Sequence, residues 1–277
     1  MPIAPMLAAH GARIPALGFG TSGLGYVRAE HVAAALKAGY RHIDTARKYG
    51  TEPAVGEGVR ASGIPRSDIF VCTKVSHENL HADDFARSVD ESLAALGLDY
   101  VDLLLVHWPE KNTPLAETMG ALAKAKRQGL TRHVGVANFN ITMLDAAIAL
   151  CPEPLITLQA ECHPYLDQSK VIAACRERGL VLTAYCPLAR GRLKDDAVLS
   201  DIGRRFGKTP AQVALRWLMQ QNMIAAIPRS SNAARIAENI DVFDFELADD
   251  DMRRIGALKR PNGRTANPVG RAPIWDT

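Results

Sequence analysis

Short apolar runs alternate with stretches of helical periodicity from about residue 16 onward, a pattern typical of repeated strand–helix units. The apolar runs predict strands over 16–21, 39–44, 69–74, 101–107, 132–137, 155–160, 180–186 and 223–228. Between them, apolar residues recur every three or four positions and predict helices over 28–38, 52–62, 81–96, 114–128, 141–150, 168–178 and 210–221. A further helical pair, 232–239 and 248–257, is expected near the end of the chain.

The boundaries of several predicted helices have a local physical cause. In the stretch 81–96, Phe85, Val89, Leu93 and Leu96 fall on one face of a helix, which would pack on a core. Glycines follow four of the helical stretches, at the position where a left-handed residue commonly ends a helix: Gly39, Gly97, Gly129 and Gly179.

The predicted strands favour a closed parallel sheet. Runs such as 101–106 are almost entirely apolar, as expected for strands buried on both faces. Eight strands, most of them followed by a helix, predict an α/β fold, a (β/α)8 TIM barrel with extra helices at the C-terminus. An open doubly wound sheet is the alternative. The segment Gly18-Phe-Gly20-Thr-Ser-Gly23 matches the dinucleotide-binding pattern only superficially, because the next helix is expected several residues later. A single domain over residues 1–277 is expected.

Composition narrows the class of protein. Hydrophobic residues make up 47% of the chain and charged residues 23%, with a net charge of +3, which is ordinary for a globular protein and gives no reason to expect nucleic-acid binding. The five cysteines show no C-x-x-C spacing, and no metal-ligand cluster is apparent. No apolar run approaches the ~20 residues that a membrane helix needs. A cytoplasmic protein is therefore expected.

Four chemically active side chains fall at the ends of neighbouring predicted strands. Asp44 ends the second strand, Lys74 the third and His107 the fourth, and Tyr49 lies in the loop after the second. Taken singly, each has an ordinary interpretation as a turn residue, a loop lysine or a core histidine. In a barrel, however, all the carboxyl ends of the strands meet at one rim, so the four groups together predict an active site there.

Elementary electrostatics suggests a role for each group. A partly desolvated Lys74 needs a counter-ion, and Asp44 is the natural one. The positive charge of Lys74 would lower the pKa of Tyr49 and make the phenol a better proton donor, while His107 offers an N–H to the same oxygen. Such a site can polarise and protonate a carbonyl, but it contains no source of hydride. A cofactor is therefore required.

These residues resemble a known set. The four groups lie in the sequence settings Ile-Asp-Thr-Ala…Tyr-Gly, Thr-Lys-Val and Leu-Val-His-Trp-Pro. In these settings they are similar to the catalytic tetrad of the aldo-keto reductases, here Asp44, Tyr49, Lys74 and His107. The resemblance covers essentially the whole chain. It implies a barrel whose N-terminal end is plugged by a hairpin, here 6–9 and 13–16, NADPH bound at the opposite rim, and a monomeric protein that acts on a small carbonyl substrate.

The same resemblance assigns cofactor contacts. At the start of the predicted helix 232–239, Arg229, Arg235 and the hydroxyl of Ser230 also form an anion site on physical grounds. The residues matching family positions are Asn138 and Gln159 for the carboxamide, Tyr185 for the nicotinamide ring, and Cys186, Pro187 and Leu188 for the pyrophosphate. Further along the chain they are Arg229, Ser230, Ser231 and Arg235 for the 2′-phosphate and Glu238 and Asn239 for the adenine, with Thr21 and Asp44 completing the set.

Several positions depart from the family pattern. Ala137 and Cys186 replace serines, Ser22 replaces an aromatic pocket wall, and Arg229 replaces a lysine. Ala137 would lose one carboxamide hydrogen bond, and Ser22 would leave the pocket open. The expected substrate contacts are Ser22, Tyr49, His107, Trp108 and Trp275, although Trp275 could instead only pin the C-terminal tail.

The expected function is NADPH-dependent reduction of a small polar aldehyde or ketone. Within the family, the chain is most similar to bacterial 2,5-diketo-D-gluconate reductases of the B type, which favours keto-sugars or methylglyoxal as substrates. Two alternatives stay open: a Schiff-base aldolase that uses Lys74, and a non-catalytic protein that binds NADPH as a sensor.

Overall fold

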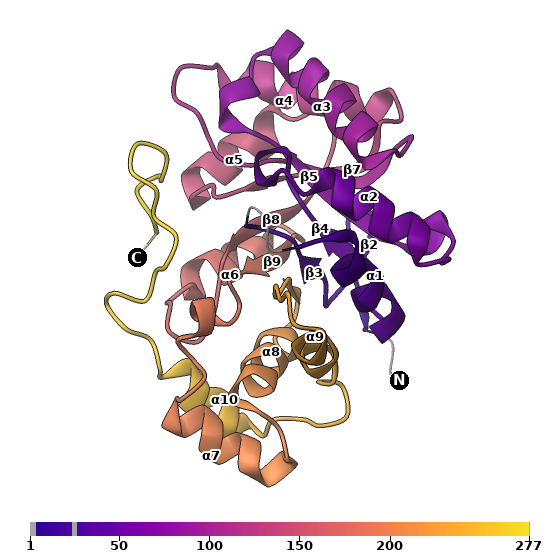
Figure 1. The fold of residues 1–277 in the computed structure, drawn as a ribbon. Coiled ribbons are helices and arrows are strands. Elements are labelled where there is room, and N and C mark those ends of the chain that lie inside the picture. The colour runs from indigo at the N-terminus through magenta and orange to yellow at the C-terminus, as the bar shows by residue number, and fades with distance from the viewer. Residues whose placement is uncertain (1–3, 24–26, 277) are drawn as a thin grey trace.

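The computed structural model describes residues 4–23 and 27–276. Eight strands form one sheet, in which every hydrogen-bonded neighbour pair is parallel and adjacent in chain order. Helices surround the strands (Figure 1). The strands are β3 (Phe19–Gly20), β4 (His42–Asp44), β5 (Phe70–Val75), β6 (Val101–Val106), β7 (Thr131–Ala137), β8 (Leu155–Glu161), β9 (Val181–Tyr185) and β10 (Ile224–Ala226).

The helices are α1 (Ala29–Ala38), α2 (Glu52–Ala61), α3 (Ala82–Leu96), α4 (Leu115–Arg127), α5 (Ile141–Leu150), α6 (Ser169–Glu177), α7 (Ala197–Phe206), α8 (Pro210–Gln220), α9 (Ala233–Ile240) and α10 (Asp249–Gly256). Helices α1 to α8 connect successive strands on the outside of the sheet, and α9 and α10 follow the last strand. Each predicted strand and helix is present, most with shorter ends.

The sheet closes between its first and last strands. Leu17 forms a parallel bridge with Ala226, and the Gly20 N–H donates to the Pro228 carbonyl at 2.9 Å. This pairing leaves no free edge on the parallel sheet, and the predicted barrel is confirmed.

An antiparallel hairpin packs at the N-terminal end of the barrel. It consists of β1 (Met6–Ala9) and β2 (Ala12–Pro15), joined by His10 and Gly11, both with positive φ. Ala9, Ala12 and Ile14 join the apolar cluster inside the barrel, beside Phe70 near the start of β5. The hairpin therefore plugs this end, as predicted, and leaves the other end for the site.

Helix α7 was not predicted, although its ends carry clear signals. The Asp196 side chain accepts hydrogen bonds from two backbone N–H groups at the helix start, and Gly207 ends it in the left-handed conformation. It packs against α8, and its Gly203 lies so close to the connecting loop that an added Cβ would sit 2.2 Å from the Lys208 carbonyl oxygen. The helix therefore depends on a neighbouring helix as well as on its own capping residues.

The segment after α10 contains no helix or strand as far as residue 276. It runs back past α6 and α5 (Figure 1). Two contacts hold its far end at the start of α5: Asn140 donates to the Ile274 carbonyl at 3.0 Å, and Asp276 accepts from the Ile141 N–H at 2.9 Å. The C-terminal segment is thus fixed to the barrel. Among the described residues, no helix is long and apolar enough to cross a bilayer.

Candidate active site

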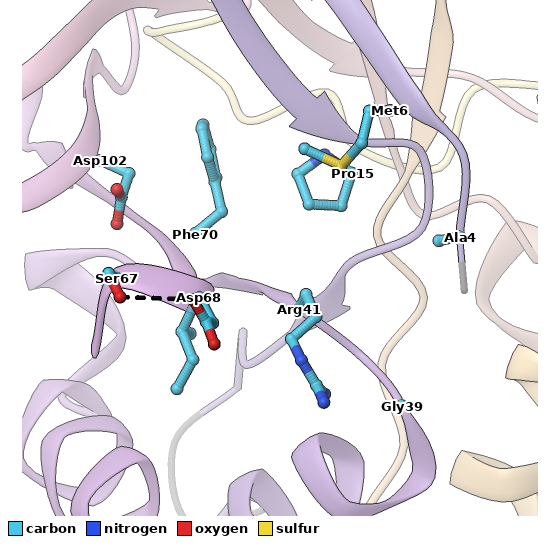
Figure 2. Close-up of a pocket in the computed structure, with 10 residues that line it drawn as sticks. Ala4, Met6, Pro15, Gly39, Arg41, Ser67, Asp68, Phe70 and Asp102 are labelled. Carbon is cyan, nitrogen blue, oxygen red and sulfur yellow. Dashed lines mark hydrogen bonds between the residues drawn. The ribbon is translucent and has the colours of Figure 1, made fainter. Parts of the chain in front are cut away.

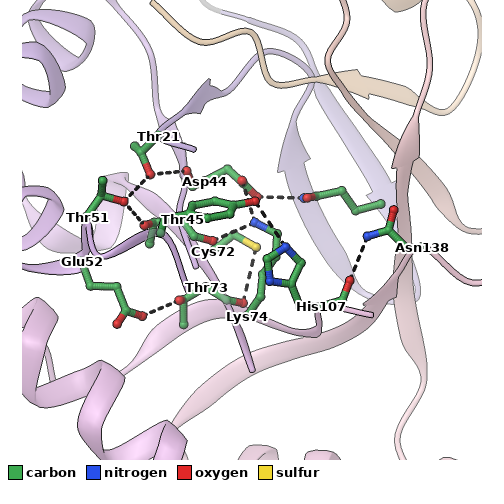
Figure 3. A network of polar contacts seen from close by, with 12 residues as sticks. Thr21, Asp44, Thr45, Thr51, Glu52, Cys72, Thr73, Lys74, His107 and Asn138 are labelled. Atoms are coloured by element: carbon green, nitrogen blue, oxygen red, sulfur yellow. Dashed lines mark hydrogen bonds and ion pairs between the residues drawn. The ribbon is translucent and has the colours of Figure 1, made fainter. Parts of the chain in front are cut away.

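A buried ion pair lies at the carboxyl ends of β4 and β5. The Lys74 ammonium donates to an Asp44 carboxylate oxygen at 2.7 Å and to the Thr45 carbonyl at 2.7 Å (Figure 3). Lys74 is 0% exposed and Asp44 only 2%. Burial alone would lower the pKa of Lys74, but the charge of Asp44 raises it above the ordinary value. Lys74 therefore stays an ammonium.

Tyr49 and His107 lie above this pair. Tyr49 ends a short 3-10 turn, Arg47–Tyr49, that follows β4, and His107 directly follows β6. The Tyr49 hydroxyl is 3.4 Å from His107 Nε2, and the Lys74 nitrogen is 5.2 Å from the centre of the Tyr49 ring. The four predicted groups thus meet at one rim.

The pKa of Tyr49 differs from the sequence-based expectation. Burial raises the pKa of Tyr49 to about 12, and the positive charge of Lys74 opposes this rise without cancelling it. The prediction of a lowered pKa is therefore wrong for the net shift, although the sign of the Lys74 contribution is correct. At neutral pH the phenol is protonated and can donate its proton.

His107 is neutral at physiological pH. Burial and the nearby charge of Lys74 hold the pKa of His107 well below its usual range. Its Nδ1 is buried and has no hydrogen-bond partner among the described residues. A bare acceptor costs less there than an unpaired N–H, so the tautomer with the proton on Nε2 is favoured. That proton points toward the Tyr49 hydroxyl.

Three further side chains are linked to these groups. Gln159, on β8, donates its amide N–H to the second oxygen of Asp44 at 2.8 Å. Asn138 donates to the His107 carbonyl at 2.9 Å and accepts the Tyr185 hydroxyl at 2.7 Å. Asn138 also has a positive φ of 64°, a conformation that asparagine tolerates better than most residues. These bonds orient both amides and leave part of each free.

A cleft of about 940 Å³ opens over these residues. It extends from Trp108 and His107 past Tyr185 and the loop after β9 to the start of α9. Sixteen of the twenty predicted site residues line it, and the four that do not are Thr21, Lys74, Ser231 and Trp275.

Thr21 lies behind the cleft wall, not in it. It is fully buried, and its hydroxyl donates to the Asp44 carbonyl at 3.0 Å and contacts Thr51 at 3.0 Å (Figure 3). The predicted cofactor contact of Thr21 is therefore not supported, because its hydroxyl is already used to hold the end of β4. Ser231 is exposed beyond the cleft.

The outer end of the cleft is basic. Arg229, Ser230 and Arg235 line it beside the start of α9, where the Asn232 side chain accepts the Arg235 N–H at 3.2 Å. Arg229 donates to the Ser22 carbonyl at 2.6 Å, so it joins the loops after β10 and β3. Two guanidinium groups at a helix start suit a doubly charged anion.

Two basic residues of the cleft were missed in the sequence. Arg190 and Lys194 line it between Tyr185 and the outer end. They follow the Cys186-Pro-Leu segment in a loop where Cys186, Ala189 and Arg190 all have positive φ. Basic residues shortly after a segment already matched to pyrophosphate were a usable signal.

A second pocket, of about 170 Å³, lies at the opposite end of the barrel beside the hairpin (Figure 2). Its polar side chains are already paired: Asp102 is 2.7 Å from the Arg66 guanidinium, and Arg41 donates to two backbone carbonyls. Phe70 and hairpin residues complete the wall. Ser67 donates to Asp68 at 3.3 Å, so the polar side chains of this pocket are engaged with one another or with the backbone, and none is a candidate proton donor beside a buried charge.

The sequence matches the aldo/keto reductase family over residues 16–260. The chain belongs to this family. Methylglyoxal reductase DkgB of Escherichia coli O157:H7 is 41% identical to it, over 95% of this chain and 99% of that protein. The expectation drawn from the tetrad motifs is thereby confirmed at family level.

Two solved structures are similar to this aldo/keto reductase. One belongs to a protein provisionally identified as a 2,5-diketo-D-gluconic acid reductase B, with a TM-score of 0.95, 46% identity, and coverage of 99% of this chain and 98% of that one. The other is a Bombyx mori aldo-keto reductase in complex with NADP, with a TM-score of 0.89, 31% identity, and coverage of 97% and 96%. As a member of the aldo/keto reductase family, the chain is an oxidoreductase.

Proposed function

We propose that the chain reduces a small polar aldehyde or ketone to an alcohol with NADPH, and that Tyr49 donates the proton. The buried Lys74–Asp44 pair beneath Tyr49, with neutral His107 at 3.4 Å from the phenol, carries this proposal. The protonated phenol and the neutral imidazole N–H meet at one place in the cleft, and the fixed charge of Lys74 is buried behind them.

The residues of the cleft fit NADPH. The partly free amides of Asn138 and Gln159 would hold the carboxamide, and the Tyr185 ring would stack on the nicotinamide. The loop 186–194 would contact the pyrophosphate, with Arg190 and Lys194 added to the predicted Cys186, Pro187 and Leu188. When bound, NADPH supplies a hydride to the carbonyl carbon.

The outer end of the cleft would hold the adenosine half of NADPH. Arg229, Ser230 and Arg235 would bind the 2′-phosphate, and Glu238 and Asn239 would lie against the adenine. Glu238 also accepts the Thr209 hydroxyl at 2.7 Å, which holds it at the rim between α8 and α9. Two guanidinium groups at this end favour NADPH over NADH.

Tyr49 and His107 act on the carbonyl oxygen. His107 Nε2–H would hold that oxygen beside the Tyr49 hydroxyl, and both donors polarise the C=O bond. As negative charge develops on the oxygen, the phenol proton moves to it. The ammonium of Lys74 then stabilises the phenolate that remains, and Asp44 keeps Lys74 charged and in place.

The two alternative functions are less well supported. A Schiff-base aldolase needs a neutral, accessible amine, but Lys74 is 0% exposed, does not line the cleft, and has a raised pKa. A sensor would not need a proton donor beside a buried ion pair. Turnover of a carbonyl would exclude the sensor directly.

The open cleft supports a small polar substrate. Ser22 is exposed at its edge, so no large side chain closes it there, while Trp108 and His107 provide one apolar and one polar wall. Methylglyoxal and keto-sugars fit this chemistry, and the similarity to the reductase named for methylglyoxal agrees with it.

We further propose that residues 1–277 act as one domain in a reducing, cytoplasmic setting. One continuous eight-stranded sheet supports the first point. The described cysteines are all free, and Cys72, Cys162 and Cys175 are buried, which supports the second.

The test is the replacement Tyr49→Phe, followed by loss of NADPH absorbance with a panel of carbonyls. We expect turnover to fall by at least about 1,000-fold, since the proton donor is lost, while NADPH affinity, measured by nucleotide fluorescence, changes less than about twofold. Tyr100→Phe is the matched control, because it also removes a tyrosine hydroxyl, but one that lies at the opposite end of the barrel and accepts a hydrogen bond from Arg132 at 2.7 Å. Full activity of Tyr49→Phe would refute the mechanism. An inactive unmodified chain that still binds NADPH would favour the sensor.

A further inference from the structure

One buried carboxylate outside the catalytic group is directed at the C-terminal segment. Glu161, the last residue of β8, is 0% exposed. One of its oxygens accepts the Thr265 N–H at 2.7 Å and the Thr265 hydroxyl at 2.5 Å, and the other accepts the Ala266 N–H at 2.9 Å. His163 Nε2 lies 3.0 Å from the first oxygen. The carboxylate thus binds two consecutive backbone N–H groups of a segment that is far away in the sequence.

These bonds compensate for burying the charge. Burial by itself would raise the pKa of Glu161, but hydrogen bonds from His163, Thr265 and Ala266 lower it below the ordinary value. The side chain is therefore an ionised acceptor, and hydrogen bonds to a charged acceptor are stronger than neutral ones. We call this contact of Glu161 with Thr265 and Ala266 the tail latch.

The tail latch is connected to the substrate end of the cleft. Ala266 lines the cleft itself. Next to it, the Arg264 guanidinium lies 3.7 Å from the centre of the Trp275 ring, and Trp275 donates to Asn267 at 2.8 Å. The Trp275 ring meets Trp108 edge to face at 6.2 Å, and Trp108 lines the cleft beside His107. A continuous set of contacts therefore joins Glu161 to the wall of the substrate pocket.

We propose that Glu161 is a positioning residue: through the tail latch it holds Ala266 and the Arg264–Trp275 stack against Trp108, and so sets the substrate wall of the cleft. This inference deepens the proposed reductase function and rests on it. Glu161 touches neither substrate nor cofactor, so its effect is on substrate affinity and not on proton transfer.

The far end of the tail has separate anchors at α5, through Asn140 and Asp276. Loss of the tail latch should therefore shift the segment without releasing it. In Glu161→Gln, an amide NH2 must face backbone N–H donors, so at least one bond of the tail latch is lost. The KM for the carbonyl should rise about tenfold. The kcat and the Kd for NADPH should change less than about threefold, because the tetrad and the cofactor residues are untouched.

The position of the tail can be measured without turnover. Limited trypsin digestion followed by mass spectrometry reports cleavage after Arg264 and Arg271, and cleavage after Arg264 should become at least about fivefold faster in Glu161→Gln as the contacts of that residue open. Thr265→Val, which removes one hydroxyl and keeps the carboxylate, should change both readouts in the same direction by a smaller factor. It keeps the test valid if Glu161→Gln folds poorly.

Asp251→Asn is the matched control for loss of a buried carboxylate. Asp251 is 1% exposed and pairs with Arg205 and Arg254 between α7 and α10, where no residue lines the cleft. The Asp251→Asn replacement should lower the free energy of unfolding without changing the KM for the carbonyl or the rate of cleavage after Arg264. In a Trp275→Ala background, the effect of Glu161→Gln on the KM should shrink to less than about threefold, since the two act through the same wall.

An unchanged cleavage rate in Glu161→Gln would overturn the tail latch. Faster cleavage with an unchanged KM would overturn the role of the tail latch in the pocket. The same holds if Glu161→Gln raises the KM as much in the Trp275→Ala background as in the unmodified chain. If the unmodified chain reduces no carbonyl, the proposed function fails, whereas the digestion still decides whether Glu161 holds the tail.

Discussion

Replacement of Lys74 by methionine removes a charge that the structure places next to the proton donor. At 5.2 Å from the centre of the Tyr49 ring, an ammonium stabilises a phenolate by about 3 kcal/mol at an effective dielectric of about 20. That energy corresponds to about two pKa units. Without Lys74, the pKa of Tyr49 would therefore rise by this amount above its value of about 12. We therefore expect kcat to fall at least about 100-fold, with the Kd for NADPH little changed.

The same replacement leaves Asp44 buried without its cation. The Gln159 amide, at 2.8 Å, would still donate to that carboxylate, but it carries no charge. Breaking a buried pair costs about 3–5 kcal/mol, so urea denaturation should show a loss of that size in the free energy of unfolding. Activity must therefore be measured at a temperature where Lys74→Met is folded by circular dichroism.

Lys48→Met is the matched control. Lys48 precedes Tyr49 directly and pairs with Glu78 at 3.0 Å, but its side chain is 38% exposed. Its removal should change kcat less than about threefold and stability by less than about 1 kcal/mol, because solvent screens the charge. The electrostatic argument is refuted if folded Lys74→Met retains kcat within threefold of the unmodified protein, or if Lys48→Met is equally impaired.

Two further predictions concern the phosphate subsite and acid stability. Arg235→Ala should raise the KM for NADPH at least about tenfold and that for NADH less than about twofold, since only NADPH carries the 2′-phosphate; an equal change in both would remove the assignment. Burial lowers the folded-state pKa of His42 and His107 below 6.5, so the folded protein binds fewer protons than the unfolded chain below that pH. The free energy of unfolding should fall as pH drops below 6.5 and show no such contribution above it. His42→Gln should make this slope shallower in urea denaturation, and an unchanged slope would show that His42 does not contribute.

Local pattern was sufficient for the architecture. Strands such as β6 are buried on both faces, so they appear as apolar runs, and glycines such as Gly97 end helices through their own backbone preference. Both signals depend on neighbouring residues in the chain. Helix α7 was missed although half of its residues are apolar and Leu199 and Ile202 are buried; its packing against α8 is visible only in the structure. The motifs around Asp44, Tyr49, Lys74 and His107 could be recognised in the sequence for a similar reason, because each lies at a fixed position relative to the end of a strand.

Properties that depend on closure of the barrel could not be obtained from the sequence. The net pKa of Tyr49 is set by how completely the fold removes water from around the phenol, and burial outweighs the charge of Lys74 that the sequence made visible. Thr21 faces Asp44 and Thr51 and not the cleft, because pairing of β3 with β4 directs its hydroxyl inward.

The chain by itself therefore determined the succession of strands and helices apart from α7, the family, and the candidate catalytic groups. Only the tertiary structure decided which atoms meet: Glu161 with Thr265, 104 positions apart, or Trp108 with Trp275. The physical reason is that periodicity and capping act over a few residues, whereas burial, charge pairing and side-chain contact depend on segments that only the closed barrel brings together.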